Sequence, residues 1–262
     1  MGRVVRQLAF SCAVACGVSC LKMAVRMVFT AELLLAMERY SLMATQIRTA
    51  DFDAWVQSLG KEVTMSEVSK KSGIPEPTLS HQRNEERIKP TTVLKTAAGF
   101  GKHKLMELAS FDGFGNLWPL PDNLLWLACV CPVDIAVELM GRRQIVEPAP
   151  DYVFEVAEDA CTRWHSLIDG GAKRMEVAEC LGIPKNRYSR LVVANSLQFE
   201  TVLDVAGYFD VSPHVGLVAC GYLTLSDIGV PDVPGALALV GDDVLLAELE
   251  ARQKVLLKSL AG

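Results

Sequence analysis

Several features of enzymes and membrane proteins are missing from this sequence. Aromatic residues make up only 7% of the chain, and its 8 cysteines show no CxxC or Cys/His spacing of the kind that holds zinc. There is no glycine-rich phosphate loop, no nucleophile beside a base and no recognisable carboxylate pair. The small-apolar run from Leu8 to Leu21 is too short to span a bilayer. The sequence therefore predicts a protein that is not an enzyme and that uses neither a metal nor a cofactor.

The composition that remains is that of a globular protein. Hydrophobic residues make up 50% of the 262 residues and charged residues 22%, which excludes a disordered or collagen-like chain. The high alanine, leucine and valine content favours helices, and the cysteines are interpreted as buried free thiols in a reducing cytoplasm. A net charge of −5, taken over the whole chain, argues against an anionic partner.

The first 42 residues differ in composition from the rest. They are rich in cysteine, valine and alanine, whereas an ordinary soluble mixture begins at Met43. We expect that Met43 is the true start of translation. The alternatives are a secretion or anchoring signal, for which the basic start and the apolar run are suitable, and an accessory helix.

The chain contains an internal repeat with a period of 109 residues. Within residues 55–108, 13 of 54 positions carry the residue found 109 positions later, where chance at average residue usage gives roughly three or four. The identities include Trp55 with Trp164 and the tripeptide at 73–75 with that at 182–184. Such self-similarity predicts two copies of one architecture.

The first copy carries the pattern of a helix-turn-helix. Thr64 and Glu67 form a capping box that starts a helix, and Gly73 supplies the left-handed residue that ends it. Pro75 permits a second helix to begin, and Leu79 is the one clear core anchor of that helix, PEPTLSHQRN. In a helix-turn-helix the second helix enters the major groove of DNA.

The second copy, MEVAECLGIPKNRYSRLVV, repeats this pattern with Tyr188 in the place of Leu79. In each copy a tryptophan-anchored helix precedes the motif, at 52–59 and 161–168, and a further helix follows it. The copies differ mostly on the outward face of the second helix, as expected of modules that read different bases. The residues predicted to contact double-stranded DNA are Lys70, Lys71, Thr78, Ser80, His81, Gln82 and Arg83 in the first copy and Lys173, Arg174, Lys185, Asn186, Arg187, Ser189 and Arg190 in the second.

The net charge of −5 argues against a DNA partner, but the charge is not evenly distributed along the chain. Residues 170–199 carry five basic and two acidic side chains, a local charge of +3 inside an acidic part of the chain. Around the first recognition helix, residues 61–89 sum to only +1. We therefore expect DNA binding that depends on a few placed cations and is sensitive to salt.

The segments outside the repeats are predicted to be helical as well. An apolar stripe along 151–168 indicates one amphipathic linker helix of roughly 27 Å. Pro132 is expected to open a helix that Gly141 ends, and Pro231 and Pro234 to break the chain before a final helix. That final helix, from about Asp242 to Leu260, could serve for packing or for dimerisation, with inward positions at Val244, Leu245, Leu249, Leu256 and Leu260.

The predicted fold class is thus all-α, with two tandem helix-turn-helix domains joined by a helical linker and followed by a C-terminal helix. The expected divisions are an N-terminal extension at 1–42, the first helix-turn-helix domain at 43–116, a helical connector at 117–150, the linker helix with the second domain at 151–230, and the C-terminal helix at 231–262.

Two stretches resemble a known family. The run ADFDAWVQSLGKEVTMSEVSKKSGIPEPTLSHQ, and SPHVGLVACGYLTLSDIG with its G-L-V-x-x-G-Y-L-T at 216–224, are similar to the immunity repressors of temperate mycobacteriophages and related actinobacterial phages. The resemblance covers about Met43 to Lys258. It implies a cytoplasmic transcriptional repressor that binds asymmetric operator and stoperator sites as a monomer, silences lytic genes and maintains lysogeny and superinfection immunity. Acidic Glu85 and Glu86, after the first recognition helix, depart from the pattern.

The sequence also allows a function of another class. A membrane-tethered or protein-binding helical adaptor would use the N-terminal apolar run as its anchor and the repeat as a partner surface. The two hypotheses differ in whether residues 43–262 bind duplex DNA.

Overall fold

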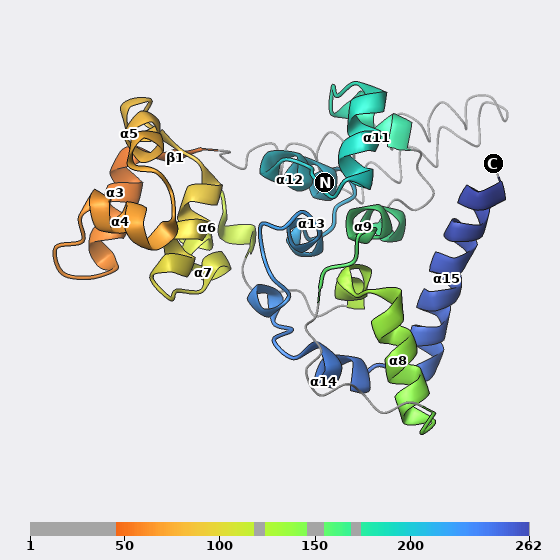
Figure 1. Ribbon diagram of the computed structural model, residues 1–262. Coiled ribbons are helices and arrows are strands. Elements are labelled where there is room, and N and C mark those ends of the chain that lie inside the picture. Colours follow the sequence, from red (N-terminus) through yellow and green to blue (C-terminus); the bar gives the residue numbers. More distant parts are fainter. Residues whose placement is uncertain (1–45, 118–123, 146–154, 169–173, 262) are drawn as a thin grey trace, which may run out of the picture. The chain divides into compact units, whose positions relative to one another are not determined.

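The computed structural model describes residues 46–117, 124–145, 155–168 and 174–261, and the side chains of the last helix as far as residue 254 (Figure 1). The protein is all-α, as predicted. Its described strands are two residues long and pair antiparallel, with Ile47 opposite Ile88. Within the described ranges, no helix is both long and apolar enough to cross a membrane. The N-terminal extension, with its alternatives of an early start site, a signal or a helix, lies outside these ranges.

The first module, described at residues 46–117, is built from short helices. In chain order its elements are β1 (Ile47–Arg48), α3 (Thr49–Ser58), α4 (Met65–Ser72), α5 (Glu76–Asn84), β2 (Arg87–Ile88), α6 (Pro90–Gly99), α7 (Lys104–Ala109) and the 3-10 turn η1 (Gly115–Leu117). Phe52, Val68, Leu79 and Leu105 from four of these helices are fully buried and form its core.

Local sequence explains where α4 begins and ends. The hydroxyl of Thr64 accepts a hydrogen bond from the backbone N–H of Glu67 at 3.2 Å, as the capping box predicts. The Glu67 carboxylate pairs with Lys71 Nζ at 2.8 Å, one turn along the helix. Gly73 ends the helix with φ +68°, a left-handed conformation that suits a residue without Cβ.

The second module, described at residues 155–168 and 174–230, has the same succession of helices, without the two short strands in those residues. They are α9 (Ala160–Ile168), α10 (Arg174–Cys180), α11 (Lys185–Val193), α12 (Phe199–Tyr208), α13 (His214–Ala219) and the 3-10 turn η3 (Ser226–Ile228). Trp164, Tyr188, Val202 and Leu217 are fully buried and belong to its core.

The 109-residue repeat is present in the backbone as well as in the sequence. Helices α11 and α12 begin and end 109 residues after α5 and α6. Positive φ angles recur at the same interval, at Gly73 and Gly182, at Glu86 and Asn195, and at Gly101 and Asp210. The last two pairs share a conformation but not a residue type. The backbone therefore repeats even at positions where the side chains differ.

The predicted linker helix from 151 to 168 is wrong in its N-terminal part. Residues 155–157 belong to no helix or strand, 158–159 form a turn, and α9 begins only at Ala160, while 151–154 lie outside the described residues. The reason is hydrogen bonding to other segments: Ala157 N–H donates to Cys129 O at 2.9 Å, and Asn195 Nδ2 donates to the carbonyls of Ala157 and Glu158. Nine helical residues give about 14 Å instead of the expected length.

The remaining elements are η2 (Leu124–Cys129), α8 (Pro132–Arg142), α14 (Val233–Ala238) and α15 (Asp242–Ala261). Pro132 opens α8 as predicted, and the helix ends one residue after Gly141. The expected break at Pro234 is wrong, because this proline lies in the first turn of α14, where no N–H donor is needed. The carboxylate of Asp232 caps that helix by accepting from Gly235 N–H.

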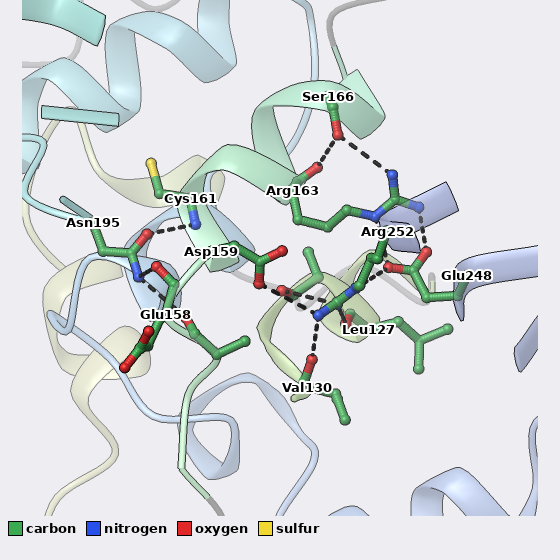
Figure 2. Close-up of polar contacts among 12 residues, drawn as sticks. Leu127, Val130, Glu158, Asp159, Cys161, Arg163, Ser166, Asn195, Glu248 and Arg252 are labelled. Carbon is green, nitrogen blue, oxygen red and sulfur yellow. Dashed lines mark hydrogen bonds and ion pairs between the residues drawn. The ribbon is translucent and has the colours of Figure 1, made fainter. Parts of the chain in front are cut away.

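The inward face of α15 carries a buried ion network beside the predicted apolar residues. Leu245 is buried as expected, but the side chains of Glu248 and Arg252 are only 7% and 5% exposed. The guanidinium of Arg163, on α9, makes two hydrogen bonds to the Glu248 carboxylate, one of them from Nε to Oε1 at 2.6 Å (Figure 2). Val244 and Leu249 are partly exposed, and the side chains of residues 256 and 260 lie outside the described set.

Arg252 extends this network to the end of η2. Its Nε donates to Glu248 Oε1 at 2.8 Å, and its two Nη atoms donate to the carbonyls of Val130 and Leu127 at 2.7 and 2.6 Å (Figure 2). A guanidinium suits this place because carbonyls at a helix C-terminus lack intrahelical partners and attract cations. The described part of α15 is therefore a packing helix, held to α9 and η2 by one buried carboxylate between two arginines.

The matching tryptophans are accommodated in two ways. Trp55 Nε1 donates to Glu107 Oε2 at 2.7 Å. The residue 109 positions after Glu107 is Gly216, and a Cβ there would lie 2.7 Å from two ring atoms of Trp164. In the first module Glu107 thus gives the Trp55 indole a hydrogen-bond acceptor. In the second module Gly216, which has no side chain, lets the Trp164 ring lie close to the backbone.

Candidate nucleic-acid interface

Helix α5 is anchored on one face and open on the other. Leu79 is 1% exposed and fixes the helix to the core, as the sequence predicts. Thr78, Ser80 and His81 are exposed on the opposite side, so their hydroxyl and imidazole groups are accessible to a partner. These three predicted contact residues therefore share one outward face.

Gln82 is predicted to contact DNA, but the structure buries its side chain. It is 6% exposed, and its Oε1 accepts hydrogen bonds from Lys89 N–H and from Thr92 Oγ1, both at 2.9 Å. Residue 82 lies three positions after Leu79, on the same inward side of the helix. Its amide therefore ties α5 to the start of α6 and is not available to DNA.

The guanidinium of Arg83 is also paired within the protein. Its Nε and Nη2 donate to the two carboxylate oxygens of Asp53, at 3.2 and 2.8 Å, which connects α5 to α3. On α4, Lys71 pairs with Glu67 and lies 4.2 Å above the Phe100 ring, while Lys70 is exposed. The accessible positive charge of the first module is therefore smaller than its residue count suggests.

Acidic side chains surround the exposed face of α5. Glu76, Glu85 and Glu86 are all exposed, and His81 Nε2 lies 3.4 Å from Glu85 Oε1. The outward surface of this helix is polar and nearly neutral. Such a surface offers hydroxyl and imidazole groups for hydrogen bonding but little attraction for a phosphate backbone.

Helix α11 presents a different surface on the same backbone. Tyr188 is fully buried at the position equivalent to Leu79, and Lys185, Asn186, Arg187 and Arg190 are exposed. Arg190 Nε donates to Asn186 O at 3.2 Å, which directs its guanidinium along the outward side of the helix. Within α11 there are three basic side chains and no acidic one.

Two of the remaining predicted residues are less accessible, and one is not described. Ser189 and Arg174 are partly buried. Lys173 lies outside the described residues. The strongest grouping is therefore the four exposed residues of α11, which we call the α11 face: Lys185, Asn186, Arg187 and Arg190.

The support beneath the α11 face includes residues that the sequence did not single out. The Tyr188 ring stacks edge-on against His165 of α9, with centroids 5.9 Å apart, and burial raises the pKa of the Tyr188 hydroxyl so that it stays neutral. Asn195, just beyond α11, has φ +49° and accepts a hydrogen bond from Cys161 N–H at 2.9 Å. An asparagine after a predicted helix, where left-handed residues occur, is a signal for such a role.

The exposed side chains of this site are suited to binding a polar or anionic partner. In the parts of the chain described, they do not form a recognisable catalytic group. No cluster of three metal-ligating side chains occurs among those residues. The α11 face offers two guanidiniums, an ammonium and an amide, which are donors for phosphate oxygens and base edges. Comparisons of the chain with protein-family models, with curated proteins and with solved structures give no match.

Proposed function

We propose that this protein is a sequence-specific transcriptional repressor that binds double-stranded DNA through two tandem helix-turn-helix modules. The observation that carries the proposal is the α11 face. It places two arginines and an asparagine on the outward side of a helix whose other side is fixed by buried Tyr188, with exposed Lys185 at the first position of the helix. The turn before it, with Gly182 at φ +64°, repeats the turn between α4 and α5.

The chemistry of the two outward faces supports reading of unlike bases. Arg187 and Arg190 suit guanine, whose O6 and N7 accept a bidentate guanidinium, and Asn186 suits adenine. Thr78, Ser80 and His81 offer shorter polar groups to the other part of the site. Because the two faces differ, we propose that one chain binds an asymmetric site as a monomer.

The second module provides most of the electrostatic attraction in this proposal. The three cations of α11 contrast with the nearly neutral outward surface of α5, so the first module contributes mainly to the choice of sequence. In keeping with the family resemblance, we propose that the repressor acts in the cytoplasm on phage or prophage lytic promoters and maintains lysogeny and superinfection immunity.

The proposal is tested by selecting duplexes from a random pool with the full-length protein. Selected duplexes and the chain's own upstream region are then footprinted and titrated in gel shifts at two salt concentrations. We expect an asymmetric protected site and an affinity that falls steeply with salt. A palindromic site would contradict binding as a monomer, and no enrichment of any duplex would overturn the proposed function.

Point variants assign the contacts. Replacing Arg187 or Arg190 by alanine should weaken binding by about 1–3 kcal/mol and relax base preference in one part of the site. The matched control is Arg143→Ala, which removes an exposed arginine at the end of α8. Equal affinities and footprints for the α11 variants and the control would refute the assignment of the α11 face.

A further inference from the structure

Two cysteines that are 59 residues apart in the chain meet inside the second module. Cys161 Sγ on α9 and Cys220 Sγ at the end of α13 lie 3.9 Å apart, in hydrogen-bonding contact. Cys161 is fully buried, whereas Cys220 is partly exposed. A disulfide needs a separation of about 2.05 Å, so the two sulfurs would have to approach each other by about 1.9 Å.

We propose that Cys161 and Cys220 form an oxidation site, which a peroxide converts into an intramolecular disulfide between α9 and α13. The pair is distinguished from the other described cysteines by its geometry. Cys129 donates its thiol to the carbonyl of Val215 at 3.7 Å and is fully buried, Cys131 is partly exposed, and Cys180 is exposed on α10. Among the described cysteines, only in the pair of Cys161 and Cys220 does a second sulfur lie within contact distance of a partly exposed thiol, that of Cys220.

The proposed reaction requires the partly exposed Cys220 to ionise more readily than the buried Cys161. The hydrogen bond between them lowers the pKa of Cys220 and, together with burial, raises the pKa of Cys161. The more accessible sulfur is thus the one that ionises first. The thiolate is the nucleophile in such reactions, so Cys220 is the attacking residue and Cys161 the resolving residue.

The chemistry balances in two steps. The Cys220 thiolate attacks one oxygen of hydrogen peroxide, the O–O bond breaks, and hydroxide leaves and is protonated to water, which gives a sulfenic acid. The Cys161 sulfur then attacks that sulfur, the S–O bond breaks, and the departing hydroxide takes up the Cys161 proton as a second water. Two thiols lose two electrons, and the peroxide is reduced to water.

The crosslink is tested directly by peptide mapping of the full-length protein. Trypsin places Cys161 alone on peptide 144–163, Cys220 alone on 191–252, and Cys129 with Cys131 on 105–142. After treatment with hydrogen peroxide and alkylation of the remaining thiols, we expect peptides 144–163 and 191–252 to be joined, and to separate on reduction. The Cys180→Ala control should form the same crosslink, and Cys220→Ala should not.

Other mapping results would overturn the proposal. These are recovery of the two peptides unjoined with Cys220 oxidised to sulfinic acid, or joining of 191–252 to 105–142 instead. The wild-type map decides the question by itself, so the proposal remains falsifiable even where a cysteine variant fails to fold.

The crosslink has a consequence for DNA binding that rests on the function proposed above. Cys161 N–H donates to the side chain of Asn195, the left-handed residue just after α11, so movement of Cys161 acts on the end of this helix (Figure 2). We expect peroxide to lower the affinity for a selected duplex about fivefold or more, reversibly with dithiothreitol, and to leave the affinity of Cys220→Ala unchanged.

The two proposals fail in distinguishable ways. A mapped crosslink without a change in affinity would refute the regulatory consequence and leave the oxidation site standing. A reduced protein that enriches no duplex would refute the DNA-binding function, whereas peptide mapping would still decide the oxidation site.

Discussion

Replacing Glu248 by glutamine should destabilise the fold strongly. The carboxylate accepts three hydrogen bonds, two from the partly buried guanidinium of Arg163 and one from the buried guanidinium of Arg252. Glutamine keeps one acceptor oxygen but turns an N–H donor toward an arginine N–H. It also removes the carboxylate charge from both arginines and leaves Arg252 with only the more distant, exposed Asp159 carboxylate at 3.5 Å among the described residues. Removing one partner of a buried pair costs about 3–5 kcal/mol. Because Arg252 keeps its carbonyl partners, we expect a loss near the lower end, about 3 kcal/mol.

The assay is urea denaturation of the full-length protein followed by circular dichroism, with thermal unfolding as a second measurement. A loss of about 3 kcal/mol corresponds to a fall in Tm of roughly 6–12 °C for a chain of this size. The matched control is Glu250→Gln on the same helix, whose carboxylate is 68% exposed and pairs with Lys254. That change should cost about 0.5 kcal/mol or less. A loss below about 1 kcal/mol for Glu248→Gln would refute the importance of the network.

Glu248 also gives the stability a pH dependence. Burial by itself raises the pKa of this carboxyl, but the hydrogen bonds and charges of Arg163 and Arg252 outweigh burial and lower its pKa below the ordinary 4.5. A carboxylate with a lowered pKa stabilises the fold above its unfolded pKa, and this stabilisation is lost as the pH falls through the folded value. The unfolding free energy of wild type should therefore fall more steeply below about pH 4.5 than that of Glu248→Gln. Parallel curves would contradict this account.

Two further predictions concern the module cores. Gly216→Ala should destabilise by about 1–3 kcal/mol in urea denaturation, because the added Cβ collides with the Trp164 ring, whereas Gly115→Ala, with open space around it, should be nearly neutral; equal stabilities would show that the indole can move aside. Gln82→Ala should cost about 1–3 kcal/mol in the same assay, because Thr92 and a backbone N–H lose their acceptor. A near-neutral Gln82→Ala would return this residue to the candidate DNA contacts.

Much of the fold could be predicted because its signals are local. Gly73, the Thr64 cap and the inward Leu79 each act within a few residues, and the repeat located a second copy of the same local pattern. The positions of α5 and α11 followed from these signals. The outward placement of Arg187 and Arg190 followed in turn, because the helical period places them away from buried Tyr188.

The errors arose where a distant partner decides the outcome. Periodicity extended a helix through 155–159, but hydrogen bonds from Asn195 and to Cys129 hold part of this segment in another conformation. Gln82 looks like a DNA contact until the two donors to its side-chain oxygen, Lys89 N–H and the Thr92 hydroxyl at the start of α6, are known. Buried Glu248 and Arg252 were missed because charged residues are rarely buried unless they are paired, and pairing across 85 residues leaves no trace in a sequence.

The two tryptophan environments bear on how the duplicated modules could have diverged. Neither copy can adopt the other's arrangement through one substitution. Glycine at position 107 would strand the Trp55 indole N–H, and glutamate at position 216 would collide with the Trp164 ring. Recombination that exchanged short stretches between the copies would therefore produce less stable chains. We expect selection against such exchange to keep the copies distinct, and with them the separate outward surfaces of α5 and α11.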